Sequence, residues 1–320
     1  MNRRPQFAIS IRGRKVALGA RTLIMGVLNV TPDSFSDGGR YLDPVRAVQQ
    51  GGELVRQGAD WLDVGGESTR PGAQPVSAEE ELRRVLPVIR DLRRKLPRVP
   101  LSIDTTKAQV AEQALDAGAD IVNDVSGLRF EPRLAEVARR YHSPLILMHL
   151  RGRPETMQRE PFARNIWRSL ANGFQTSIRR ALAAGVDRSQ LILDPGLGFG
   201  KSRRQNYEIL AGLEKLRRFR LPLLIGASRK SFVQAIVAGE ALDPSQARRP
   251  GARYWPVGEA RCQELKGSRD TPEKNSALLT GDAAAVVAAI LGGAHIVRVH
   301  DPGAILPAVR VADALLAAGG

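Results

Sequence analysis

Eight short apolar runs separated by helix-like stretches constrain the fold of this chain more than any other feature. The runs are nearly continuous in Val, Ile and Leu, as expected for parallel strands covered on both faces. They occupy residues 22–30, 60–66, 100–105, 120–127, 144–149, 191–196, 222–228 and 295–301. Helical patterns lie between them, for example at 77–95, 106–118 and 203–217. Eight strands alternating with helices in 320 residues predict an α/β fold, a (β/α)8 TIM barrel, as one domain over 1–320. A doubly wound sheet is the alternative.

Two segments depart from this alternation. Residues 6–18 are predicted to form an N-terminal β-hairpin that turns at Arg12 and Gly13. Residues 242–275 are polar, rich in Pro and Gly, and without a clear period. This stretch is predicted to be a loop insertion between strands seven and eight, with the helical pattern resuming near Leu278.

The net charge of +15 suggests an anionic partner: nucleic acid, anionic lipid or a small anionic substrate. The arginines are scattered in pairs along the predicted helices, with few aromatic residues between them. This pattern argues against a dedicated nucleic-acid surface. The alternative is that most of the excess positive charge lies on an ordinary basic surface in contact with solvent.

The chain holds a single cysteine, Cys262, which excludes an internal disulfide framework and a multi-cysteine zinc site. No apolar run reaches 18 residues, and no apolar leader follows Met1. We therefore expect no membrane span and no signal peptide, and the cytoplasm is the expected location.

Polar side chains stand at the carboxyl end of every predicted strand, where barrels of this kind place their chemistry. They are Asn29, Asp63, Asp104, Asn123, Asp124, His149, Asp194, Ser228, Arg298 and His300, with Lys230 just beyond strand seven. A lone Asp often caps the next helix, which would explain Asp63 and Asp124, and His149 alone suggests a structural histidine. Capping does not explain Lys230, Arg298 or His300, and alternation puts the last two on one face of their strand. A site at this end of the barrel is therefore predicted.

Three loops beyond these strand ends are candidates for contacting a ligand. Residues 29–39 and 65–73 are rich in Gly, Ser, Thr and Pro, and we expect them to act as lids. Residues 194–202 contain three alternating glycines, which let backbone approach a flat ligand, and Phe199 as a stacking surface. This segment is not a P-loop, because Pro195 holds the place of the first glycine.

These motifs together resemble the dihydropteroate synthases of folate biosynthesis, a family of pterin-binding TIM barrels. The matching segments run in order from residue 26 to 301: GVLNVTPDSFSDGG, DVGGESTRPGA, SIDTTK, VNDVSG, MHLRGRPETMQ, LDPGLGFGK, GASRKSF and IVRVHD. The resemblance implies a transferase that condenses 7,8-dihydropterin-6-ylmethyl diphosphate with p-aminobenzoate under Mg2+, and a homodimer. The products would be 7,8-dihydropteroate and pyrophosphate.

The resemblance also implies a role for each matching residue. Asp104, Asn123, Asp194 and Lys230 would hold the pterin, and Met148 is a further substrate-binding residue. Asn29 would ligate Mg2+ and would hold the pyrophosphate together with Arg70, Arg298 and His300. The p-aminobenzoate site would be lined by Thr69, Pro71, Phe199, Lys230 and Ser231. The catalytic set would be Asp33 from the first loop, Lys230, Arg298 and His300.

The chemistry of the residues agrees with these roles. A carboxylate such as Asp194 can accept two hydrogen bonds from the N–H edge of a pterin, and the fork of Arg298 matches phosphate geometry. Two alternatives remain: a pterin-binding methyltransferase acting from a folate to a corrinoid, and a basic, non-catalytic nucleic-acid-binding barrel. A methyltransferase would not need residues that hold a pyrophosphate. The acidic residues at the strand ends argue against nucleic-acid binding.

Overall fold

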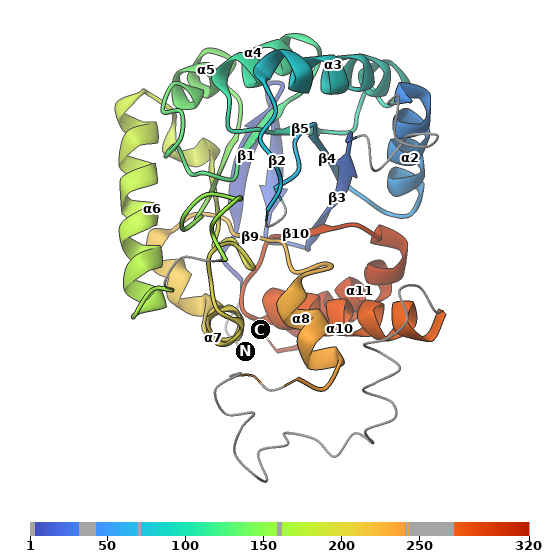
Figure 1. Cartoon of the computed structure of the whole chain (residues 1–320), viewed down its shortest axis with the longest axis vertical. Helices are drawn as coiled ribbons and strands as arrows, with labels where there is room; N and C mark the ends of the chain where they lie inside the picture. The colour runs from blue at the N-terminus through green and yellow to red at the C-terminus, as the bar shows by residue number, and fades with distance from the viewer. Residues whose placement is uncertain are drawn as a thin grey trace.

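The predicted barrel is present. In the computed structural model, which describes residues 4–31, 43–69, 72–158, 162–240, 242 and 272–319, eight strands form one parallel sheet in the order β8-β7-β6-β5-β4-β3-β10-β9. A bridge between Leu193 and Leu223 joins the two ends of this order, so the sheet closes on itself. Figure 1 shows the helices as a ring around the strands.

The strands follow the apolar runs. They are β3 (Leu23–Asn29), β4 (Trp61–Gly65), β5 (Leu101–Asp104), β6 (Ile121–Asp124), β7 (Leu145–Met148), β8 (Leu191–Asp194), β9 (Leu224–Ile225) and β10 (Ile296–Val299). The seventh run, 222–228, gives the shortest strand, which ends at Ile225, before the segment that carries Ser228. There the Ser228 hydroxyl and the Arg229 N–H both donate to Asp282 Oδ2, at 3.1 and 2.8 Å.

The helices of the described residues cover the outside of the barrel. They are α2 (Pro44–Arg56), α3 (Ala78–Lys95), α4 (Ala108–Asp116), α5 (Leu134–Arg140), α6 (Ile166–Ala183), α7 (Arg203–Ala211), α8 (Ser231–Val237), α10 (Pro272–Leu291) and α11 (Pro302–Ala318), with 3-10 helices η1 (Arg188–Gln190) and η2 (Leu213–Phe219). Their inner faces and the outer faces of the strands form the main core, which includes Leu54, Leu62, Val85 and Ile103.

Two helix predictions need correction. The pattern over 203–217 is two elements, α7 and η2, which divide at Gly212. A Cβ at Gly212 would lie 2.7 Å from the ring of Trp167, so the chain breaks where another helix packs closely. The other correction concerns α10, which begins at Pro272, six residues before Leu278, so residues 272–275 are helical. Proline is favoured at the first helical position, where its missing N–H costs nothing. Of the expected insertion, 243–271 lies outside the described residues.

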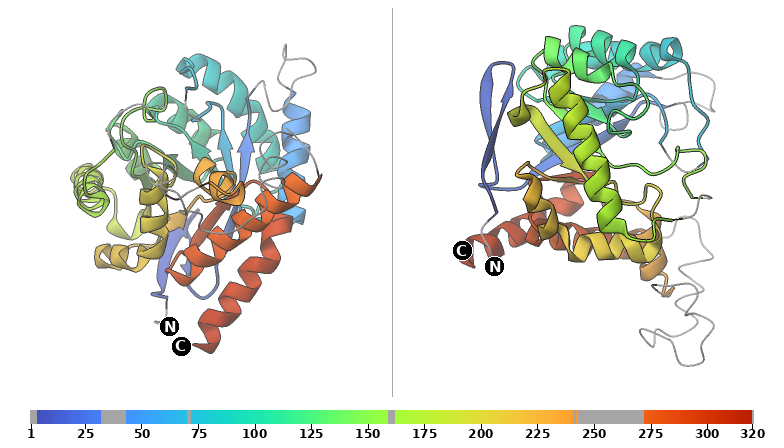
Figure 2. Two further views of the ribbon diagram at one scale, coloured as in Figure 1. Left: turned by 60° about the horizontal axis from the view of Figure 1, so that its bottom comes forward. Right: turned by 90° about the vertical axis from the view of Figure 1, so that its left-hand side faces the viewer.

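The predicted hairpin is confirmed and closes one end of the barrel. Strands β1 (Phe7–Ile11) and β2 (Arg14–Leu18) pair antiparallel, and the turn residues Arg12 and Gly13 both have positive φ, 50° and 72°. Its apolar face packs on side chains that begin the barrel strands, namely Leu23, Trp61, Ile121, Ile146, Ile192, Leu224 and Ile296. Figure 2 shows the hairpin as a separate layer at this end, opposite the strand ends that carry the polar residues.

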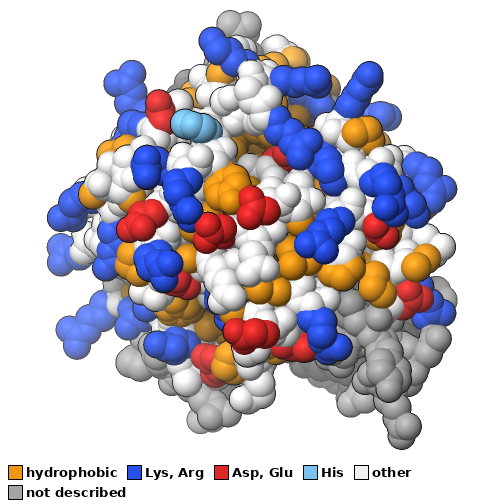
Figure 3. All heavy atoms as spheres, turned by 90° about the horizontal axis from the view of Figure 1, so that it is seen from above, with side chains coloured by type: hydrophobic (Ala, Val, Ile, Leu, Met, Phe, Trp, Pro, Cys, Tyr) orange, Lys and Arg blue, Asp and Glu red, His pale blue; other side chains and the backbone are white. Residues whose placement is uncertain are grey.

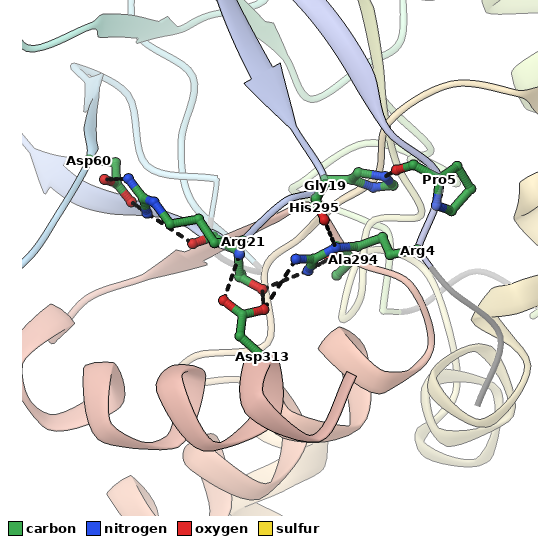
Figure 4. Close-up of polar contacts among 9 residues, drawn as sticks. Arg4, Pro5, Gly19, Arg21, Asp60, Ala294, His295 and Asp313 are labelled. Atoms are coloured by element: carbon green, nitrogen blue, oxygen red, sulfur yellow. Dashed lines mark hydrogen bonds and ion pairs between the residues drawn. The ribbon is translucent and has the colours of Figure 1, made fainter. Parts of the chain in front are cut away.

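A polar network fixes the N-terminal segment beneath the hairpin (Figure 4). Arg4, which is 7% exposed, donates to Thr22 Oγ1 and the Ala294 carbonyl, both at 2.7 Å, and pairs with Asp313 of α11 at 3.1 Å. His295 Nδ1 accepts from the Leu223 N–H at 3.1 Å, and so Nε2 carries the proton and donates to the Pro5 carbonyl at 2.9 Å. Burial lowers the pKa of His295 to about 4.

The surface is basic without a single dense stripe on the face that Figure 3 draws. There, over the side that α3, α4 and α5 form, Lys and Arg side chains are spread widely, with Asp and Glu among them. No helix in the described part of the chain is long and apolar enough to cross a membrane.

Candidate active site

A pocket opens at the carboxyl ends of the strands. Sheet register builds it, because Asp104 of β5 lies opposite Asn123 of β6, and Met148 of β7 lies opposite Asp194 of β8. Its empty volume is about 330 Å³, including the part open to solvent. The lining residues are Thr69, Asp104, Asn123, Val125, Met148, Asp194, Gly196, Leu197, Phe199, Gly226, Lys230 and Arg298. The structure therefore brings together most of the residues that the sequence predicted for substrate binding.

An ion-pair network forms one wall of the pocket. Arg298 donates from Nε to Asp63 Oδ2 at 2.6 Å and from Nη2 to Asp104 Oδ2 at 2.9 Å. Asn123 Nδ2 donates to the same Asp63 oxygen at 3.0 Å. Asp63 is 0% exposed, so it is a buried anchor for two pocket side chains and not a helix cap. This finding corrects the capping interpretation of Asp63 and shows that the Arg298 fork already holds two carboxylates.

Burial raises the pKa of both acidic groups that line the pocket, Asp104 and Asp194, and neighbouring cations limit the increase. Burial, followed by the neighbouring charge of Asp63, raises the pKa of Asp104 well above its usual range, while Arg298 opposes the shift. Burial also raises the pKa of Asp194. The Gly196 N–H, which donates to Asp194 Oδ1 at 2.7 Å, and the charge of Lys230 limit that increase.

Lys230 faces the carboxylates across the pocket from the start of α8. Burial and the positive charge of Arg298 lower the pKa of Lys230 to about 8. Its Nζ lies 4.3 Å from the centroid of the Phe199 ring, within range of a cation–π contact. The pocket thus combines buried carboxylates, an amide, two cations and an aromatic wall, which suits a flat, polar heterocycle next to an apolar ring.

Three predicted site residues lie outside the pocket lining. Asn29 ends β3 and is half-buried, Ser231 begins α8 and is exposed, and His300 follows β10 with its Nδ1 3.3 Å from Ser228 Oγ. Three more, Asp33, Arg70 and Pro71, lie outside the described residues.

The other two strand-end residues have structural roles. Asp124 accepts from the backbone N–H groups of Ser126 and Leu128, so it caps the turn after β6 and not the next helix, α5, whose N-cap residue is Arg133. His149 is 9% exposed, and its Nε2 lies 3.2 Å from Ser169 Oγ. Burial lowers the pKa of His149 well below its usual value, so it is a neutral packing residue.

The sequence prediction missed the residues that hold the pocket loops. Lys107 donates to Glu67 Oε2 at 2.5 Å and to the buried Glu81 Oε2 at 2.6 Å, and thus ties the loop that carries Thr69 to α3. Lys201 ties the loop after β8 to the end of β7, because its Nζ donates to the carbonyl oxygens of His149, Gly196 and Phe199. Both lysines fall inside the quoted motifs, but no local pattern distinguishes them from surface lysines.

Known proteins share both the sequence and the fold of this chain. A family profile described as pterin binding enzyme matches residues 25–300. The dihydropteroate synthase of Synechocystis sp. is 44% identical over 297 residues, which cover 93% of this chain and 91% of the relative. The crystal structure of the Yersinia pestis dihydropteroate synthase with a sulfonamide drug complex superposes with a TM-score of 0.79 at 38% identity, covering 97% of this chain and 100% of that one. The structure of the Xanthomonas albilineans dihydropteroate synthase with 4-aminobenzoic acid has a TM-score of 0.78 at 37% identity, covering 98% of this chain and 99% of that one.

Proposed function

Because the chain belongs to the pterin-binding enzyme family, and within it to the dihydropteroate synthases, we propose that it joins 7,8-dihydropterin-6-ylmethyl diphosphate to p-aminobenzoate. It is a transferase of folate synthesis that yields 7,8-dihydropteroate and pyrophosphate. The observation that carries this function is the pocket in which Asp104, Asn123, Asp194 and Lys230 surround one space at the strand ends.

The pterin is proposed to bind against the buried carboxylates. Asp194, at 5% exposure, would accept N–H groups from the aminopyrimidinone edge, and Asn123 would meet the remaining polar edge together with Asp104. Lys230 would donate to a ring acceptor. Hydrogen bonds to a charged group contribute roughly 1.5–3 kcal/mol each, enough to fix the orientation of the ring.

The p-aminobenzoate ring is proposed to lie on the side of the pocket formed by Thr69 and Phe199. Ser231, exposed at the start of α8, would meet its carboxylate, because backbone N–H groups at a helix start favour negative charge. Pro71 is assigned to this site through the resemblance alone.

The pyrophosphate is proposed to lie toward Asn29, Arg70, Arg298 and His300, with Mg2+. The residues present fit this ion, since Asn29 offers an amide oxygen at the end of β3, and Mg2+ commonly takes its other ligands from substrate phosphates and water. Within the described ranges, no group of three His, Cys, Asp or Glu side chains could hold a metal without substrate. When bound, the ion would offset charge on the leaving group.

The reaction forms a C–N bond and breaks a C–O bond at the exocyclic methylene carbon. The aniline nitrogen supplies the electron pair, pyrophosphate leaves with the C–O pair, and the nitrogen then loses a proton. An electron-rich pterin supports positive charge at that carbon, so catalysis rests on stabilising the departing anion and excluding water. Asp33 is proposed to act from the first loop, and no dedicated base is required because the aniline is weakly basic.

The direct test is incubation with the pterin diphosphate, p-aminobenzoate and Mg2+, followed by mass detection of dihydropteroate. Formation that depends on both substrates supports the proposal. Transfer of a methyl group from a methylated folate to a corrinoid, without dihydropteroate, would identify the alternative methyltransferase.

A homodimer is proposed, supported by an apolar outer surface on α11. Val311 and Leu315 lie one turn apart and are 59% and 45% exposed. Sedimentation should give a dimer that Leu315→Glu combined with Val311→Glu weakens. Val45→Glu, on an exposed position of α2, is the matched control. A monomeric parent chain would refute this part.

The cytoplasm is proposed as the location. A diphosphate ester does not cross membranes unaided, so an enzyme that consumes it works where the ester is made. Cell fractionation with detection of the chain tests this location.

A further inference from the structure

Lys201 is buried among backbone carbonyl groups at the back of the pocket. It is 2% exposed, and its Nζ donates to the carbonyl oxygens of His149, Gly196 and Phe199 at 2.9, 2.8 and 2.9 Å. A protonated lysine has three N–H donors, so the three oxygens match its capacity. Burial lowers the pKa of Lys201 to about 7, while the charge of Asp194 opposes that shift.

The three carbonyls belong to two different elements. His149 follows β7, whereas Gly196 and Phe199 lie in the loop after β8. The ammonium therefore ties that loop to the neighbouring strand end. Carbonyl oxygens that converge without a cation repel one another. Removal of the ammonium should therefore shift the loop after β8 away from the end of β7.

The tied loop supplies two parts of the pocket. The Gly196 N–H donates to Asp194 Oδ1 at 2.7 Å, which holds the carboxylate in place. The Phe199 ring lines the pocket and lies 4.3 Å from Lys230 Nζ. Lys201 itself is absent from the lining that the described residues form, so it reaches the ligand space only through Gly196 and Phe199.

The loop is also conformationally demanding. Gly196, Gly198 and Gly200 all have φ between 64° and 84°. A Cβ at Gly196 would lie 2.3 Å from the His149 carbonyl oxygen, the same oxygen that Lys201 holds. Glycines lose much backbone freedom on ordering, so a loop with three of them needs a strong internal contact to keep one shape.

We propose that Lys201 is a positioning residue whose ammonium acts as an internal cation, gathering three carbonyls so that Gly196 and Phe199 stay in their pocket positions. It acts through these two residues. When its side chain is cut back, the same cradle should accept a small primary ammonium from solution. The inference rests on the proposed function only where substrate kinetics are the readout.

The test is chemical rescue of Lys201→Ala, which lacks a fragment equivalent to propylammonium. We expect its KM for p-aminobenzoate to rise roughly tenfold or more, because displacement of a pocket wall by about 1 Å can cost up to a hundredfold. Propylammonium should lower that KM and raise the melting temperature of the variant. Tetramethylammonium, which has no N–H donors, should do neither. The control is Lys215→Met, at an exposed lysine of η2, which should respond to neither salt.

The outcomes separate this inference from the proposed function. A KM unchanged in Lys201→Ala, or an altered KM that both salts leave unchanged, overturns the positioning role. If the parent chain makes no dihydropteroate, the proposed function fails. Selective thermal stabilisation of Lys201→Ala by propylammonium would still show that the three carbonyls bind an ammonium. If this variant does not fold in buffer, recovery of refolding with propylammonium alone supports the inference, and equal behaviour in both salts refutes it.

Discussion

At the scale of single residues, the arrangement of the pocket depends on one carboxylate that does not line it. Asp63 receives hydrogen bonds from Arg298 and Asn123 on one oxygen, and both donors face the ligand space. The guanidinium in turn holds Asp104. The orientation of these polar groups is thus set before a ligand arrives, which reduces the reorganisation that binding must supply.

Asp63→Asn should weaken binding of the pterin, with or without its diphosphate. Arg298 and Asn123 both donate to Asp63 Oδ2, and an uncharged amide would offer these donors either a single oxygen or N–H groups. We therefore expect the binding free energy of the pterin to weaken by about 1–3 kcal/mol, the scale of a hydrogen bond to a charged group. It should also lower the pKa of Asp104, because Asp63 is a neighbouring like charge that raises it. Calorimetry measures the first effect, with Asp91→Asn on the outside of α3 as control. Affinity equal to that of the parent chain would contradict the anchor role.

Arg298→Lys should weaken the pterin diphosphate more than the corresponding hydroxymethyl pterin. A lysine keeps the charge but cannot bridge Asp63 and Asp104, so both ligands should lose affinity. The additional loss for the diphosphate, roughly 1–3 kcal/mol, would measure contact with the leaving group. Paired titrations of the two ligands give this difference, and Arg94→Lys is the surface control. Equal losses for both ligands would remove Arg298 from the leaving-group site.

At the scale of elements, the parts of the fold with a local signal were predictable. The hairpin turn, the positions of the eight strands and the polar strand ends all follow from short-range patterns such as Arg12-Gly13 and the run into Asp104. The break at Gly212 was not predictable, because it depends on Trp167 from another helix. Lys201 was missed and Asp63 was taken for a helix cap for a similar reason, since Lys201 reaches His149, 52 residues away, and Asp63 binds Arg298, 235 residues away in the chain.

Two glycine substitutions should have opposite effects on stability. Gly52 lies in α2 with nothing within 4 Å of an added Cβ, so Gly52→Ala should raise the free energy of unfolding by about 0.5–1 kcal/mol. Gly196→Ala places a Cβ against the His149 carbonyl at positive φ, and should lower it by about 1–3 kcal/mol. Denaturant unfolding of both variants measures these changes. A stable Gly196→Ala with intact substrate binding would show that the loop adapts easily.

At the scale of the whole molecule, the two ends of the barrel have different tasks. The end at the strand termini holds the pocket, while the opposite end is filled by the hairpin and by the network of Arg4, His295 and Asp313. This network joins the start of the described chain to its last helix. It therefore contributes to global stability and lies far from the ligand.

Acidification should weaken this network through His295. The unfolded chain takes up a proton on this histidine near pH 6.5, and the folded chain only near pH 4, because burial keeps the ring neutral. Between these values the unfolded state binds more protons, so the free energy of unfolding falls as pH decreases. In His295→Asn this part of the pH dependence should disappear, a change on the order of 2–3 kcal/mol across the window. Unfolding at several pH values measures it, with the exposed His142→Asn as control; identical slopes in parent and His295→Asn would contradict the assignment.

The plug at the hairpin end has a consequence for molecular traffic. Apolar side chains fill that end, so in the part of the chain that the structure describes, the pocket at the strand ends is where reactants would enter and products leave. Asp104 and Asp194 are 7% and 5% exposed, so a pterin that binds against them as proposed has to enter before p-aminobenzoate. A molecule bound at the mouth of the pocket, outside the buried carboxylates, would therefore block both the entry of the pterin and the release of product.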